Sequence, residues 1–142
     1  MTDEQRKERY DIAREHFQCA LDILLKNYDH EHPVIAQTYN LIGVACENSG
    51  NYMEAISYIR QALELHTKVL GEEHIVTLRM YRNMGRLYFR LSQISHIQED
   101  IDEAWYYNNK ALNGYQKQYE NNTAAVKDVL CRLEILVRQR GQ

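Results

Sequence analysis

The sequence has little of what several protein classes need. Its 142 residues include one proline, six glycines and no low-complexity tract, which argues against a disordered chain and a turn-rich β-sandwich. No apolar run approaches the roughly 18 residues that span a bilayer. The opening residues, 1–10, are mostly charged, so they are not expected to form the apolar core of a secretory signal. We therefore expect no membrane span.

A strong excess of charge of one sign is also absent. The chain has 17 basic and 20 acidic residues, a formal net charge of −3. It therefore lacks the overall positive charge that is typical of proteins that bind nucleic acids. Apolar residues make up 44% and charged residues 26%, an ordinary globular composition. At this length the chain predicts one domain, over residues 1–142, with a sizeable core.

Cysteine and histidine do not stand at the spacings of metal ligands. Cys19, Cys46 and Cys131 are an odd, scattered set without a CxxC pair, as expected for thiols in a reducing compartment. We therefore expect a cytoplasmic protein, cytoskeletal or ciliary assemblies included. No catalytic or phosphate-binding motif occurs, and His30, His32 and His74 are interpreted as turn residues. The sequence predicts no enzyme, no cofactor and no metal site.

What the sequence does have is an internal repeat. Four positions recur 42 residues on, from Tyr10, Ala13, Ala20, Leu21 to Tyr52, Ala55, Ala62, Leu63. A second set recurs at the same spacing, from His32, Val34, Tyr39, Gly43 to His74, Val76, Tyr81, Gly85. Ala104, Ala111 and Leu112 follow at a spacing of 49, so seven extra residues lie between Gly85 and Ala104. Fixed periods of this size indicate stacked supersecondary units.

Each unit is predicted to be two helices. Apolar residues follow the spacing of one buried helical face over 34–48 and over 52–70, and a glycine-containing break separates the two runs. Helices are also expected over 3–27 and 124–140, which makes about six. Gly43 and Gly85 share one repeat position and suggest a tight helix crossing. The seven-residue insert, 92–98, is expected to continue as helix, to lengthen its hairpin and to protrude from one edge.

This pattern resembles the tetratricopeptide repeat, on Tyr39, Ile42, Gly43, Cys46, Tyr52, Ala55, Ile59 and Ala62. The period and the linkers at 28–33 and 69–74 resemble the kinesin-light-chain-like subtype. The resemblance implies an all-α, right-handed superhelical solenoid of antiparallel helix pairs. Its parts would be a half repeat at 3–28, repeats at 33–70 and 75–119, and a half repeat at 122–140. Asn108 departs from the pattern, because a large apolar residue is expected there.

One polar stripe is a candidate binding site. Arg79, Arg82, Arg86 and Arg90 follow one another at steps of 3, 4 and 4, which places them on one helix face. The resemblance implies that the first helix of each repeat lines a concave groove, and its pattern gives these candidate positions: Asn40, Val44, Arg79, Arg82, Asn83, Arg86 and Arg90. Met84, Leu87 and Leu91 are expected on the core side. The alternative is an ordinary solvated helix face.

Two functions follow from this pattern. The first is a non-catalytic adaptor that binds a protein or peptide, of acidic character, through the groove. The alternative is a structural subunit of a larger assembly, which docks or oligomerises through its terminal helices. The helix over 3–27 favours this alternative, because its apolar residues exceed what one neighbour covers: Ile12, Phe17, Leu21, Ile23, Leu24 and Leu25. About two thirds of the eleven tyrosines, four of which are Tyr106, Tyr107, Tyr115 and Tyr119, are expected in the core.

Overall fold

The computed structural model describes residues 1–118 and 123–141. These residues form six helices and the short segments between them, and none of them forms a strand. The helices are α1 (Asp3–Asn27), α2 (Pro33–Asn48), α3 (Tyr52–Leu70), α4 (Ile75–Ser95), α5 (Gln98–Gln118) and α6 (Ala124–Arg140). The chain forms two compact units, Met1–Gly71 with α1 to α3 and Glu72–Gln142 with α4 to α6. The predicted repeat limits at 119 and 122, and Tyr119, lie outside the described residues.

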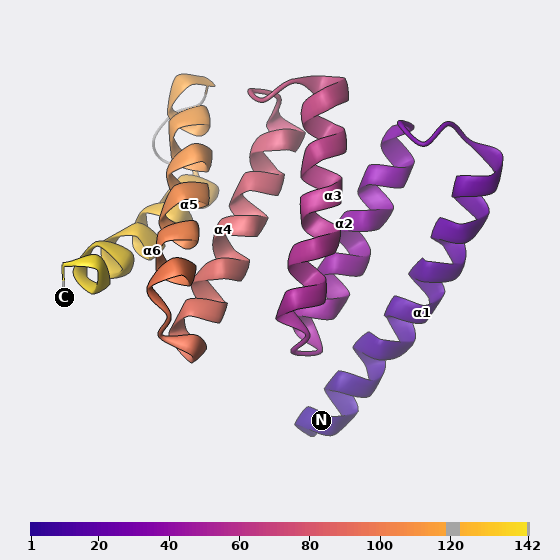
Figure 1. The fold of residues 1–142 in the computed structure, drawn as a ribbon, viewed down its shortest axis with the longest axis horizontal. Helices are drawn as coiled ribbons and strands as arrows, with labels where there is room; N and C mark the ends of the chain where they lie inside the picture. Colours follow the sequence, from indigo (N-terminus) through magenta and orange to yellow (C-terminus); the bar gives the residue numbers. More distant parts are fainter. Residues whose placement is uncertain (119–122, 142) are drawn as a thin grey trace. The chain divides into compact units, whose positions relative to one another are not determined.

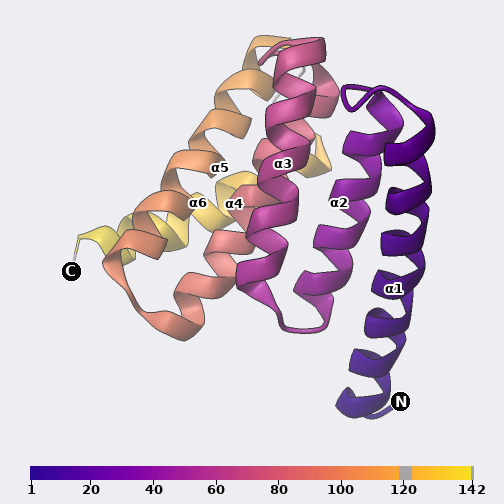
Figure 2. The same ribbon diagram turned by 45° about the vertical axis from the view of Figure 1, so that its right-hand side comes forward.

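In unit 1, three antiparallel helices pack in chain order, α1 on α2 and α2 on α3 (Figure 1). The turned view shows the same order (Figure 2). Ile35, Ile42 and Ile59 are fully buried. A Cβ atom on Gly43 would lie 2.5 Å from Cγ1 of Ile59, so glycine allows α2 and α3 to approach closely. The tight crossing predicted at this position is confirmed.

In unit 2, α5 packs against both α4 and α6. Met84 and Leu87 of α4 and Leu136 of α6 are fully buried. A Cβ atom on Gly85 would lie 2.7 Å from the side-chain amide of Asn108, so the second glycine also serves a close approach. Asn108 is itself fully buried, although a large apolar residue is expected at its position.

The linker histidines begin helices. Nδ1 of His32 accepts a hydrogen bond of 3.2 Å from the backbone N–H of Val34, and Nδ1 of His74 accepts one of 3.1 Å from Val76. Each side chain therefore accepts a hydrogen bond from one of the backbone N–H groups that have no partner in the first turn of a helix. This confirms that both are turn residues of the repeat. No group of metal-binding side chains is found in the described part of the chain.

The insert is helical over 92–95, at the end of α4, and again at Gln98, where α5 begins. Helix α4 has 21 residues against 16 in α2 and ends at Ser95, so it is lengthened as predicted. The predicted continuous helix through 92–98 is wrong, because His96 adopts a left-handed conformation with φ of 54°. The Ser95 hydroxyl donates to Asp100 at 2.6 Å and accepts from the Ile97 N–H at 3.2 Å. These bonds favour a new helix start over continuation. The protrusion of the hairpin stays a prediction.

Candidate interaction surface

Unit 1 holds two of the predicted site residues. Asn40 and Val44 lie one turn apart on α2, and both are half-buried. They lie on the same side of the helix because residues four apart are neighbours on a helix surface. This part of the candidate surface is uncharged.

Unit 2 holds the other five predicted site residues, and all of them lie on α4. Arg79 is exposed, Arg82, Arg86 and Arg90 are half-buried, and Asn83 is 5% exposed. Nη1 of Arg86 donates to Oδ1 of Asn83 at 3.3 Å. Met84 and Leu87 are buried and Leu91 is half-buried. The division of α4 into a core side and an arginine side therefore follows the prediction.

A further arginine comes from α6. Arg132 is 6% exposed, donates from Nε to Oδ1 of Asn108 at 2.9 Å and pairs through Nη1 with Asp128 at 2.6 Å. Its Nη2 is buried without a hydrogen-bond partner in the described structure. Arg132 was not among the predicted site residues. Its place in the repeat, 49 residues after Asn83, is the signal that could have found it.

The arginines of the two helices influence one another. The pKa of Arg132 is lowered, first by burial, while Asp128 opposes the shift and the positive charges of Arg86 and Arg82 add to it. We call Arg82, Arg86 and Arg132 the arginine cluster. Planar guanidinium groups bind carboxylates through paired hydrogen bonds. Where the guanidinium groups of the cluster reach the surface, they have the chemistry to pair with an anion.

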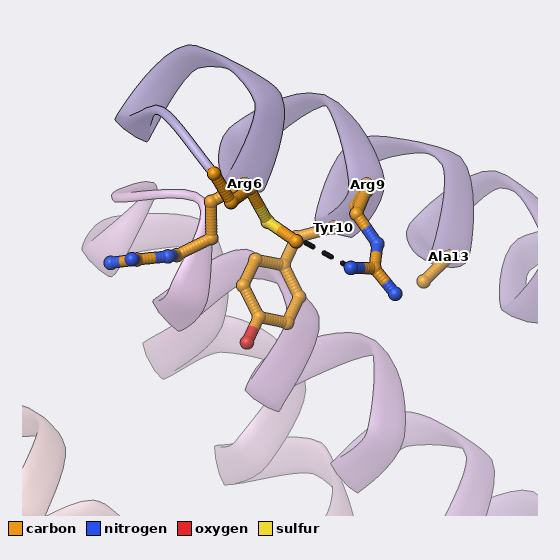
Figure 3. Close-up of a pocket in the computed structure, with 5 residues that line it drawn as sticks. Arg6, Arg9, Tyr10 and Ala13 are labelled. Carbon is orange, nitrogen blue, oxygen red and sulfur yellow. Dashed lines mark hydrogen bonds between the residues drawn. The ribbon is translucent and has the colours of Figure 1, made fainter.

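A separate hollow lies on α1 (Figure 3). It is lined by Met1, Arg6, Arg9, Tyr10 and Ala13, with a volume of about 480 Å³. Nη1 of Arg9 contacts Sδ of Met1 at 3.8 Å, and Arg6 pairs with Asp3 at 3.7 Å. Both arginines are exposed and Tyr10 is half-buried. These residues include no pairing of acid, base and nucleophile, so the hollow offers no catalytic arrangement.

Comparison with known families decides the assignment. The family model of the tetratricopeptide repeat matches residues 2–49 and 34–95. The chain belongs to the tetratricopeptide-repeat family. The resemblance found in the sequence is therefore confirmed, and so is the all-α fold of helix pairs. Proteins of this family are modules for protein–protein interaction and are typically not catalytic.

Solved structures show the same fold. The crystal structure of BtubC (BKLC) from P. vanneervenii matches at a TM-score of 0.80 and 25% identity, over 94% of this chain and 51% of that one. A candidate kinesin light chain of Podosopora anserina, with nearly identical TPR-like repeats, matches at a TM-score of 0.81 and 18% identity. The match covers 99% of this chain and 64% of that one. The chain thus spans about half to two thirds of the length of these structures.

No curated protein matches the chain. Within the described residues, no helix is both long and apolar enough to cross a membrane.

Proposed function

We propose that this protein is a non-catalytic adaptor that binds an extended acidic segment of a partner protein through the arginine side of α4. The guanidinium groups pair with carboxylates of the segment, and Asn83 hydrogen-bonds to its backbone. Asn40 and Val44 are proposed as contacts in unit 1. The adaptor works in the cytoplasm, cytoskeletal or ciliary assemblies included, and binds no nucleic acid.

The observation that carries this proposal is that guanidinium groups of α4 and α6 come together in the arginine cluster of unit 2. Arg82 and Arg86 lie close enough to Arg132 for their positive charges to lower its pKa, and Asp128 pairs with Arg132. No hydrogen bond or ion pair joins Arg82 to the residues that the structure describes. A solvated helix face usually mixes its charges, whereas like charges one turn apart repel. An anionic ligand relieves that repulsion.

The test uses an acetylated octa-glutamate peptide as the probe and an octa-glutamine peptide as the neutral control. Binding is measured by fluorescence anisotropy at low and high salt. We expect the acidic peptide alone to bind, and its affinity to fall as salt rises, because exposed charges are screened within about 8 Å at physiological ionic strength.

The decisive variant is the double substitution Arg82→Glu and Arg86→Glu, which we expect to weaken binding at least tenfold. Its matched control, Lys127→Glu with Arg138→Glu, changes the net charge equally at two exposed positions of α6. The control should retain most of the affinity. Equal losses in both variants, or no effect of salt, would show that the arginine side is a solvated face.

The alternative function, a structural subunit that docks through its terminal helices, rests on exposed apolar residues. Ile12 and Ile23 of α1 are 47% and 61% exposed, and Val137 of α6 is 58% exposed. Sedimentation at high protein concentration tests this alternative. Association that Ile12→Ser and Ile23→Ser abolish supports it, and a strict monomer contradicts self-association.

A further inference from the structure

Two equivalent pockets lie in the two units. The first, which we call the Tyr39 pocket, has a volume of about 260 Å³ and is lined by His30, Tyr39, Gln61, Glu64, Leu65 and Lys68. The second, the Tyr81 pocket, has a volume of about 210 Å³ and is lined by Glu72, Glu73, Leu78, Tyr81, Lys110, Asn113, Gly114 and Lys117. Every residue that lines the first has its repeat equivalent in the second, 42 or 49 positions on.

The walls of the two pockets have the same construction. Tyr39 lies 6.3 Å from Tyr58 with an interplanar angle of 30°, and Tyr81 lies 6.3 Å from Tyr107 with an angle of 31°. A lysine of the second helix pairs with a glutamate of the preceding linker in both units, Lys68 with Glu31 and Lys117 with Glu73. The two pockets are therefore two copies of one structural feature.

The pockets differ in what lies over the tyrosine ring. In unit 2, Nζ of Lys110 lies 5.8 Å from the centroid of the Tyr81 ring, within the range of a cation–π contact. In unit 1 the equivalent residue is Gln61, whose amide donates to the carbonyl oxygen of Ser57 at 3.4 Å. No cation of the described residues lies over the Tyr39 ring.

The charges of the Tyr39 pocket also leave room for a cation. Lys68 is neutralised by Glu31, while the exposed Glu64 has neither an ion pair nor a hydrogen bond in the described structure. The Tyr39 pocket therefore has one carboxylate in excess. The Tyr81 pocket would have the same excess without Lys110, because Glu72 and Glu73 face the single ammonium of Lys117.

We propose that the Tyr39 pocket binds a cationic side chain, lysine or arginine, of a partner protein. The cation lies over the Tyr39 ring, as Lys110 lies over Tyr81, and pairs with the carboxylate of Glu64. The pocket belongs to unit 1 and selects positive charge, so it is a second contact that is independent of the arginine cluster. A partner that uses both surfaces carries a basic residue as well as an acidic segment.

The test probe is Nα-acetyl-lysine methylamide, with its Nε-acetylated form as the neutral control. Binding is followed by chemical-shift changes in two-dimensional NMR spectra of the whole chain. We expect saturable shifts at Tyr39 and Glu64 with the charged probe and none with the neutral one. Shifts that are equal for both probes, or absent at these residues, would overturn the proposal.

Gln61 and Lys110 occupy the same position in the two pockets, and exchange of their side chains provides the matched variants. Gln61→Lys should place an ammonium group of the chain itself over Tyr39 and abolish the chemical-shift changes that the probe causes there. Lys110→Gln should free the Tyr81 ring, so the probe should cause new chemical-shift changes at Tyr81. Glu64→Gln should weaken binding about fivefold, the effect of a single exposed charge contact. Circular dichroism checks that each variant is folded. Binding to Gln61→Lys with the parent's affinity would contradict the proposed place of the cation.

Discussion

In unit 2, Nε of Arg132 donates a hydrogen bond of 2.9 Å to Oδ1 of Asn108, and both side chains are buried. Nδ2 of Asn108 donates in turn to the carbonyl oxygen of Ala104 at 2.7 Å. In the preceding repeat the equivalent of Asn108 is Ile59, which packs against Gly43. The polar pair of Asn108 and Arg132 thus takes the place of an apolar contact. The buried guanidinium of Arg132 depends on Asn108 for the acceptor of its Nε–H.

Replacement of Asn108 by leucine should therefore destabilise the protein. The substitution keeps the side-chain size but leaves the buried Nε of Arg132 without its acceptor. We expect a loss of about 2–4 kcal/mol in the free energy of unfolding, measured with urea. Asn109→Leu is the control, because its amide bonds to Trp105 at a half-buried position. A loss for Asn108→Leu no larger than for Asn109→Leu would contradict the argument.

The glycines at the helix crossings should not tolerate a methyl group. Gly43→Ala gains about 1 kcal/mol of helix propensity, but its Cβ would lie 2.5 Å from Cγ1 of Ile59 and 3.3 Å from the carbonyl oxygen of Ala55. We expect a net loss of about 1–3 kcal/mol, measured by thermal unfolding. Gly141→Ala is the control, since no atom lies closer than 3.5 Å to its added Cβ. A Gly43→Ala protein as stable as the parent would disprove the close crossing.

Most of the fold could be predicted from the sequence, because each helix carries its own local signals. The predicted helices over 3–27, 52–70 and 124–140 agree with α1, α3 and α6. At α2 the helix starts one residue earlier, at Pro33, because proline fits the first turn, where its missing N–H is not needed. Local periodicity did not reveal the break at His96, which depends on hydrogen bonds of the Ser95 hydroxyl.

The surface was harder to predict than the helices. The arginine side of α4 followed from spacing alone. The buried Arg132 is positioned by Asp128, one turn earlier on α6, and by Asn108 of α5, and no local pattern encodes this second contact, which joins two helices. The tyrosines also show this limit. The prediction that two thirds lie in the core is wrong, since Tyr81, Tyr88 and Tyr115 are the three buried ones among those described. A phenol ring can pack its face while its edge stays in water.

The histidine that begins α4 should stabilise it as a cap. His74→Ala removes the acceptor of the Val76 N–H, and we expect a loss of about 1 kcal/mol in the free energy of unfolding. His74→Asn keeps an acceptor at the same place and should recover most of that loss. Urea denaturation of the three proteins makes the comparison. If alanine and asparagine give equal stability, the histidine is not a cap.

The thiol of Cys46 should make the protein less stable in alkali. Burial raises its pKa to about 11, while the charge of Arg14 lowers it and Glu54 raises it further. The protonated thiol donates to Oε2 of Glu54 at 3.8 Å. In the unfolded chain the thiol has its ordinary pKa of 9.0. Between these two values the unfolded chain therefore loses the proton while the folded protein keeps it.

A group with a raised folded-state pKa stabilises the protein below the unfolded value, and this contribution is lost as pH rises toward the folded one. The free energy of unfolding should thus fall between about pH 9 and pH 11. Cys46→Ala should remove part of that fall, on the order of 1 kcal/mol. Cys19→Ala, a change at an exposed cysteine, should leave the fall unchanged. Tyrosine ionisation is common to all three proteins, so only the difference between their pH profiles reports on the buried thiol. Identical profiles for the two variants would show that Cys46 ionises as freely in the folded protein as in the unfolded chain.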